Sequence, residues 1–124
     1  MARSSHARLG AIGERIAARY LERQGMAVLA RNWRASGPAR GELDLVARDG
    51  GVLVICEVKT RRHARAGAPL EAVTARKVVQ LRRLATAYLA ATGTTASGIR
   101  IDAVGVTWPA TGGRAQITHV AGIG

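Results

Sequence analysis

Four acidic residues and one lysine stand close together in the segment 41–59. Glu42 and Asp44 are two apart on one apolar run, and Glu57 and Lys59 are two apart on the next. Because residues i and i+2 of a β-strand point to the same face, two adjacent strands would place three carboxylates and one ammonium on one patch of sheet. Carboxylates so close together repel, and a cation relieves that repulsion. We expect that cation to be a divalent metal.

The chemistry that suits this arrangement is phosphodiester hydrolysis, which needs charge stabilisation at the phosphate and a positioned water. Mg²⁺ or Mn²⁺ is the expected cofactor, with Asp44 and Glu57 as its ligands, because hard ions prefer carboxylate oxygens. Lys59 would orient the attacking water or bind the scissile phosphate. Only two lysines, Lys59 and Lys77, occur among the 19 basic residues, and a compact ammonium suits a point charge at a phosphate better than arginine does.

Two helices and five strands must position these residues. Apolar residues at helical spacing predict a first helix over 9–23, with Leu9, Ile12, Ile16 and Tyr20 as its apolar stripe. A second helix is predicted over 70–91. Strands are predicted over 26–33, 42–48, 52–60, 99–107 and 116–121, with a tight hairpin at 49–51 and a loop over 61–69.

The resulting order, αβββαββ, predicts an α/β fold with a mixed sheet flanked by helices. The continuous apolar run 52–56 indicates a central strand that is covered on both faces. A length of 124 residues suits one domain, residues 1–124, and no apolar run is long enough to span a membrane. One cysteine, Cys56, allows no internal disulfide and favours a cytoplasmic protein.

The formal net charge of +11 favours a nucleic-acid partner, because Lys and Arg neutralise phosphates. Coding bias toward arginine is the competing explanation of the residue type, although it does not explain the excess over acids. Tyr20, Trp33, Tyr88 and Trp108 are the only aromatic residues, and they fall at expected core positions. Base stacking is therefore disfavoured, and double-stranded or branched DNA is the expected partner.

The sequence resembles the PD-(D/E)xK motif of restriction-endonuclease-like nucleases. Asp44 is followed by a hairpin and then by Glu57-Val58-Lys59, and Leu43 stands where the motif name has proline. More closely, the chain resembles the YraN-type uncharacterised bacterial family, which is similar to Holliday junction resolvases. That resemblance covers most of the chain and is carried by segments 41–49 and 57–61, Gly13-Glu14, Ala17, Tyr20-Leu21, Ala30-Arg31-Asn32-Trp33, the second helix and Arg100-Ile101-Asp102. It implies a restriction-endonuclease-like fold with Asp44, Glu57 and Lys59 as the active site.

Other positions carry open alternatives. Glu42 either serves the metal site, as a neighbour of the metal or as a ligand of a second metal, or is a solvated acid at the edge of the sheet. Glu14 matches a first-helix glutamate that resolvase-like nucleases place beside the metal, or else it is a surface acid. Gln80 would complete the site from the second helix, unless it is an exposed polar residue. Arg100 and Asp102 are expected to form a structural ion pair. Phosphate contacts, or simple solvation, are expected of Arg61, Arg62, Arg65 and Lys77.

The leading hypothesis is therefore a Mg²⁺- or Mn²⁺-dependent endonuclease that cleaves DNA, including branched or junction DNA. A homodimer would supply the two active sites that junction cleavage requires. The alternatives are a nucleic-acid-binding module that is non-catalytic or works through a partner, and a nuclease that acts on RNA. Carboxylates facing phosphate would weaken the affinity of a module that only binds, which favours catalysis.

Overall fold

A computed structural model describes residues 5–37, 40–64 and 73–124, without the side chains of 5–7, 63 and 64. The predicted order of elements is confirmed. The elements are α1 (Ser5–Arg23), β1 (Ala27–Arg34), β2 (Glu42–Asp49), β3 (Val52–Ala64), α2 (Ala75–Thr92), β4 (Gly98–Pro109) and β5 (Gln116–Val120).

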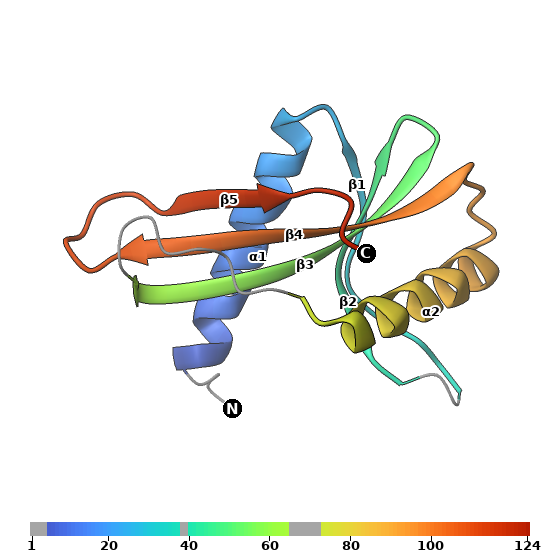
Figure 1. Ribbon diagram of the computed structural model, residues 1–124, viewed down its shortest axis with the longest axis horizontal. Coiled ribbons are helices and arrows are strands. Elements are labelled where there is room, and N and C mark those ends of the chain that lie inside the picture. Colours follow the sequence, from blue (N-terminus) through green and yellow to red (C-terminus); the bar gives the residue numbers. More distant parts are fainter. Residues whose placement is uncertain (1–4, 38–39, 65–72) are drawn as a thin grey trace.

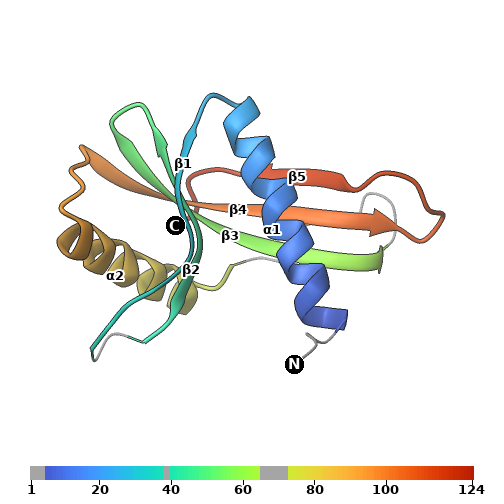
Figure 2. The ribbon, with the colours of Figure 1, turned by 180° about the vertical axis from the view of Figure 1, so that it is seen from behind.

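The five strands form one sheet in the order β1-β2-β3-β4-β5. Neighbouring strands are antiparallel except for β3 and β4, which run parallel because α2 carries the chain back between them. The mixed α/β fold is thus as predicted. The two helices lie on opposite faces of the sheet, with α1 in front of it in Figure 2 and behind it in Figure 1.

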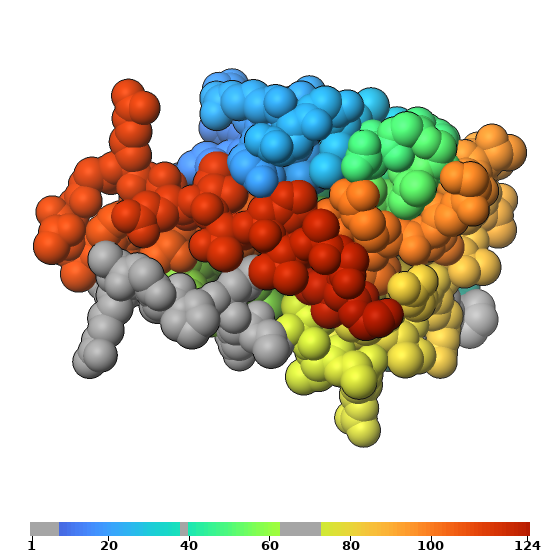
Figure 3. Space-filling model, turned by 45° about the horizontal axis from the view of Figure 1, so that its top comes forward, coloured from blue at the N-terminus to red at the C-terminus, as the bar shows by residue number. Residues whose placement is uncertain are grey.

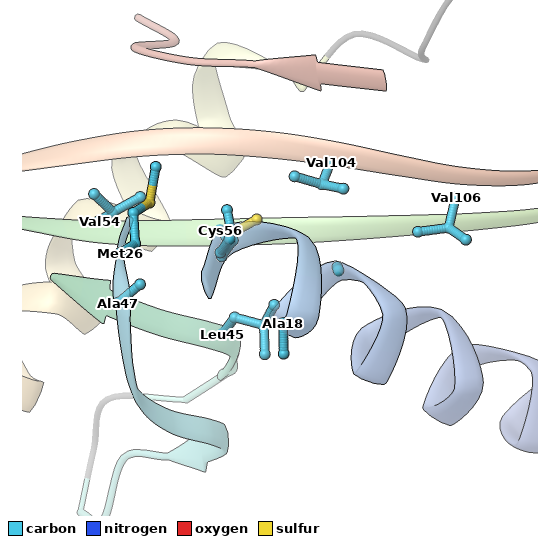
Figure 4. Close-up of a cluster of buried hydrophobic side chains, with 10 residues drawn as sticks. Ala18, Met26, Leu45, Ala47, Val54, Cys56, Val104 and Val106 are labelled. Atoms are coloured by element: carbon cyan, nitrogen blue, oxygen red, sulfur yellow. The ribbon is translucent and has the colours of Figure 1, made fainter. Parts of the chain in front are cut away.

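Two hydrophobic clusters, one on each face, hold the helices to the sheet. Alternate residues of β3 serve the two clusters: Val54 and Cys56 face α1 (Figure 4), whereas Leu53 and Ile55 face α2. All four are fully buried, so the prediction of a central strand covered on both faces is confirmed. Trp33 and Tyr88 meet edge to face on the α2 side, with ring centroids 5.3 Å apart.

The buried face of α1 differs from the predicted stripe. Ala17, Ala18 and Leu21 are fully buried, whereas Ile12 is 41% exposed. Small residues face the sheet because the helix approaches β3 closely at Gly13, where an added Cβ would lie 2.9 Å from Cγ2 of Thr60 and still closer to its hydroxyl. The larger residues of the predicted stripe, Ile16 and Tyr20 among them, pack only at the border of the cluster.

The predicted boundaries of α2 and β3 need correction. The second helix begins at Ala75 rather than at residue 70, because Thr74 is its N-cap and accepts a hydrogen bond from the backbone N–H of Lys77 at 3.1 Å. β3 continues through Ala64, so Arg61 and Arg62 belong to a strand and pair with β4 instead of forming a loop. Residues 65–72 lie outside the described part of the chain.

A polar network ties α1 to the far edge of the sheet. Asp102 on β4 is fully buried and accepts two hydrogen bonds from Arg100, at 2.9 and 3.0 Å, as the predicted ion pair requires. Its carboxylate also meets Nε2 of His119 on β5 at 2.8 Å, and Nδ1 of that ring lies 3.0 Å from the hydroxyl of Tyr20. Figure 3 shows β5 and the last residues lying between α1 and α2 on this face.

Burial alone would raise the pKa of Asp102, but the hydrogen bonds from Arg100 and His119 prevail and lower it. The network is therefore built around a charged aspartate. Across the described residues, no helix has both the length and the apolar character needed to cross a membrane.

We expect Gly13→Ala to lower the free energy of unfolding by about 1–3 kcal/mol, because the new methyl group would push α1 away from Thr60. Gly10→Ala is the matched control on the same helix, since a Cβ there meets nothing within 4 Å. That substitution should raise stability by up to about 1 kcal/mol through helix propensity. Urea denaturation monitored by circular dichroism measures both. Equal effects of the two substitutions would contradict the close approach.

Candidate active site

The candidate site forms where β2 separates from β3. The two strands pair from Asp49 and Val52 at the hairpin to Leu45 and Cys56, and within the described strands the ladder stops there. The next position on β2 is Asp44, whose Oδ2 accepts a hydrogen bond from the backbone N–H of Val58 at 2.9 Å. A carboxylate thus takes the place of a strand partner, and this fixes Asp44 beside β3.

Burial and mutual repulsion govern the ionisation of the two carboxylates at this point. Burial is the main cause that raises the pKa of Glu57, which is 8% exposed, and the charge of Asp44 raises it further. The pKa of Asp44 is also raised, chiefly by burial and then by Glu42, although its hydrogen bond from Val58 opposes the shift. Ionising both carboxylates therefore costs free energy, and a bound cation would offset that cost.

The only two lysines of the chain flank this pair. Nζ of Lys77, on α2, lies 3.8 Å from Oε1 of Glu57. Both Lys77 and Lys59 act to lower the pKa values of Asp44 and Glu57, but they do not cancel the raised values. Lys77 was predicted to contact nucleic acid, and the structure places it against a carboxylate of the site.

A cavity of about 310 Å³ opens between α1 and the two separating strands. Its polar lining includes Asp44 from β2, Lys59 from β3 and Glu14 from α1. Glu14 had been predicted only as one of two alternatives, because it lies off the apolar stripe of its helix. The structure brings it to the same cavity as Asp44 and Lys59, since the sheet-facing side of α1 is the side that carries Ala17 and Leu21.

Asn32 on β1 contacts both Glu14 and Glu42, the two glutamates for which the sequence left alternative roles. In the amide orientation that satisfies the network, its nitrogen donates to Oε2 of Glu14 at 2.5 Å and to Oε1 of Glu42 at 2.9 Å. Arg34 meets the other oxygen of Glu42 at 3.4 Å. Sequence reasoning had assigned Asn32 no role. Its only signal was its presence among the residues that carry the family resemblance.

The remaining predicted residues lie at varying distances from this centre. Gln80 on α2 donates from Nε2 to the carbonyl of Arg40 at 3.4 Å, so it stands at the entrance of β2 and supports the backbone there. Arg61 and Arg62 follow Lys59 along β3, and Arg62 is exposed. Arg65 lies outside the described residues, and its predicted role stays a prediction.

Asp44 and Glu57 fit a hard divalent cation in their chemistry. Both offer carboxylate oxygens, their charges are incompletely compensated, and Mg²⁺ typically takes one or two carboxylates and completes its shell with water and phosphate. Elsewhere in the described part of the chain, and here as well, no three or more His, Cys, Asp or Glu side chains form a group suited to a metal ion. The fit therefore rests on the two carboxylates.

The profile of the uncharacterised protein family UPF0102 matches residues 13–106. A UPF0102 protein of Nocardioides sp. is 53% identical over 116 residues, which cover 94% of this chain and 90% of that protein. The corresponding values for a UPF0102 protein of Kineococcus radiotolerans are 52%, 93% and 92%. A UPF0102 protein of Streptomyces coelicolor is 47% identical, with coverage of 93% and 87%. The predicted resemblance to the YraN-type family is thereby confirmed.

We expect Asp44→Asn to raise the melting temperature in metal-free buffer at pH 7. The asparagine keeps an acceptor for the N–H of Val58 but avoids the cost of a buried charge. Because the folded-state pKa of Asp44 is raised, that cost is present above the folded pKa, shrinks as the pH falls through it, and is absent below the ordinary value of 3.8. The advantage of the variant should therefore vanish near pH 3.

Asp49→Asn is the matched control, since Asp49 lies on the same strand and pairs with Arg100 at 3.0 Å. It should lower the melting temperature slightly at pH 7. Thermal denaturation at both pH values, with a chelator present, measures the two variants side by side. An Asp44→Asn protein that is less stable than the parent at pH 7 would contradict the electrostatic account.

Proposed function

This chain belongs to the uncharacterised protein family UPF0102, and we propose that it is a metal-dependent endonuclease that hydrolyses phosphodiester bonds of DNA. The observation that carries the proposal is the electrostatic proximity of Asp44, Glu57 and Lys59 where β2 separates from β3. They lie beside a cavity whose lining includes Asp44, Lys59 and Glu14. Two carboxylates with raised pKa values and two neighbouring lysines suit a site for a cation and a phosphate.

Asp44 and Glu57 would hold Mg²⁺ or Mn²⁺. When bound, that ion would supply charge stabilisation at the phosphate and a more acidic water. Lys59, whose ammonium acts on both Asp44 and Glu57, would bind the scissile phosphate or orient the water that attacks phosphorus. Glu14 faces the same cavity from α1, so its carboxylate can accept a hydrogen bond from that water. In the hydrolysis, the water oxygen bonds to phosphorus and the bond from phosphorus to the leaving oxygen breaks.

Charge and shape support DNA as the substrate. The formal net charge is +11, and Arg61 and Arg62 extend the cationic character of Lys59 along β3. Trp33 and Tyr88 are engaged with each other in the core, and Tyr20 packs against His119, so these rings offer no stacking platform for single-stranded bases. We therefore propose double-stranded or branched DNA, and a homodimer would supply paired sites for junctions.

We expect the wild-type protein to cleave labelled duplex or branched DNA only when Mg²⁺ or Mn²⁺ is added. Asp44→Ala and Lys59→Ala should each lower the cleavage rate by at least about 100-fold, because each removes charge from the reacting phosphate or its metal. Both variants should still bind DNA in a gel-shift assay. In the absence of metal, Asp44→Ala should bind more tightly, since one carboxylate fewer faces the phosphates.

Asp49→Asn and Arg23→Ala serve as controls for the loss of an acid and of a cation, because both residues lie away from the cavity. Cleavage that is unaffected by either active-site substitution would overturn the site assignment. Wild-type protein that binds DNA but does not cut it would support the binding module instead. Cutting of RNA alone would support the RNA-directed nuclease.

A calorimetric Mn²⁺ titration should show saturable binding that Glu57→Ala removes.

A further inference from the structure

We infer that Asn32 is a positioning residue, whose carboxamide holds Glu14 and Glu42 together at the border of the active-site cavity. The inference rests on the proposed function and adds to it a residue that would act through two carboxylates, without touching substrate itself. It begins from two contacts that join three elements: α1 supplies Glu14, β1 supplies Asn32 and β2 supplies Glu42.

The sheet register places Asn32 at the site. Arg31 pairs with Leu45 and Trp33 pairs with Leu43, so the residue between them on β1 stands opposite Asp44 on β2. From this position the side chain reaches Oε2 of Glu14 at 2.5 Å and Oε1 of Glu42 at 2.9 Å.

The backbone at this position is unusual in a way that suits asparagine. Asn32 has a φ of +50°, and it is the one non-glycine residue in the described part of the chain with a positive φ. Asparagine tolerates this left-handed conformation better than most residues, but glycine tolerates it at least as well. A purely structural role would therefore be served by glycine too. Only the side chain supplies the two N–H donors that the carboxylates accept.

The carboxamide resolves an electrostatic conflict. Glu14 and Glu42 carry like charges and both meet the same nitrogen, so without a donor between them they would repel. Glu42 also has an ion pair with Arg34 at 3.4 Å, and Arg34 is 80% exposed. When the carboxamide is lost, Glu42 is free to follow Arg34 toward solvent. We therefore assign Asn32 the role of keeping both carboxylates beside Asp44, where they would accept hydrogen bonds from the waters of a bound metal.

The first test is a double-mutant cycle on cleavage. Asn32→Gly, which keeps the backbone conformation and removes the donors, should lower kcat by about 10- to 100-fold with little change in KM for DNA. Asn32→Asp should lose at least as much, because it replaces the donor by a third carboxylate. In a Glu14→Gln/Glu42→Gln background, Asn32→Gly should have no further effect, since the residues it positions are already altered.

The second test does not depend on activity. Asn32 is the only asparagine in the chain, so selective ¹⁵N-asparagine labelling gives a single side-chain carboxamide signal in an NMR spectrum. In metal-free protein, Glu42→Gln and Glu14→Gln should each shift this signal, whereas Asp49→Asn should not. Addition of Mg²⁺ should shift it saturably in the wild type and not in Glu57→Gln. These spectra also show whether each variant is folded.

The outcomes separate this inference from the proposed function. If the wild type cleaves DNA but Asn32→Gly is equally active, or if the losses in the cycle simply add, the positioning role is wrong and the nuclease stands. A carboxamide signal that ignores both glutamate substitutions also overturns the positioning role. If the wild type neither cleaves DNA nor responds to Mg²⁺, the proposed function fails and this inference fails with it.

Discussion

The hydrogen bond from the backbone of Val58 to the carboxylate of Asp44 is the interaction on which the candidate site depends. It allows β2 to leave β3 without an unsatisfied N–H, because a side chain takes over the pairing that the main chain gives up. The separation opens room for the cavity, and it keeps Asp44 within electrostatic reach of Glu57. The cost is a pair of partly buried carboxylates, which the hydrophobic clusters on both sides of β3 hold in place.

Much of this fold was predictable from the sequence, because the signals were local. The glycine pair at the hairpin fixed the register of β2 and β3, and the run 52–56 identified the central strand. The centre of the site followed from the same two strands, since Asp44 and Glu57 stand at equal distances from the hairpin. The start of α2 was also predictable, because threonine is a favoured N-cap residue and Thr74 directly precedes the helix. The extension of β3 to Ala64 was harder to predict. Its basic residues have little strand propensity of their own, and they are strand residues because they pair with β4.

The rest of the site depends on contacts that periodicity does not encode. The close approach of α1 at Gly13 selects small residues for its buried face, so the stripe of large apolar residues was misleading. Glu14 reaches the cavity because the buried face of α1 is the side that carries Ala17 and Leu21, and not the stripe of large apolar residues. The role of Asn32 could not be predicted from the sequence for a similar reason. Its positive φ within a strand and its contacts with two carboxylates from other elements arise only when the chain is folded.

The buried thiol of Cys56 gives the molecule a reporter of its own opening. Its sulfur lies within the cluster beneath α1, on the same strand as Glu57 and Lys59. Burial raises the pKa of this thiol, and the negative charges of Asp102, Asp44 and Glu57 raise it further. The reactive thiolate is therefore strongly disfavoured while the cluster around Cys56 stays packed. Since Cys56 is the only cysteine, the rate at which a thiol reagent modifies the protein follows the opening of the central strand beside the site, with no engineered probe required.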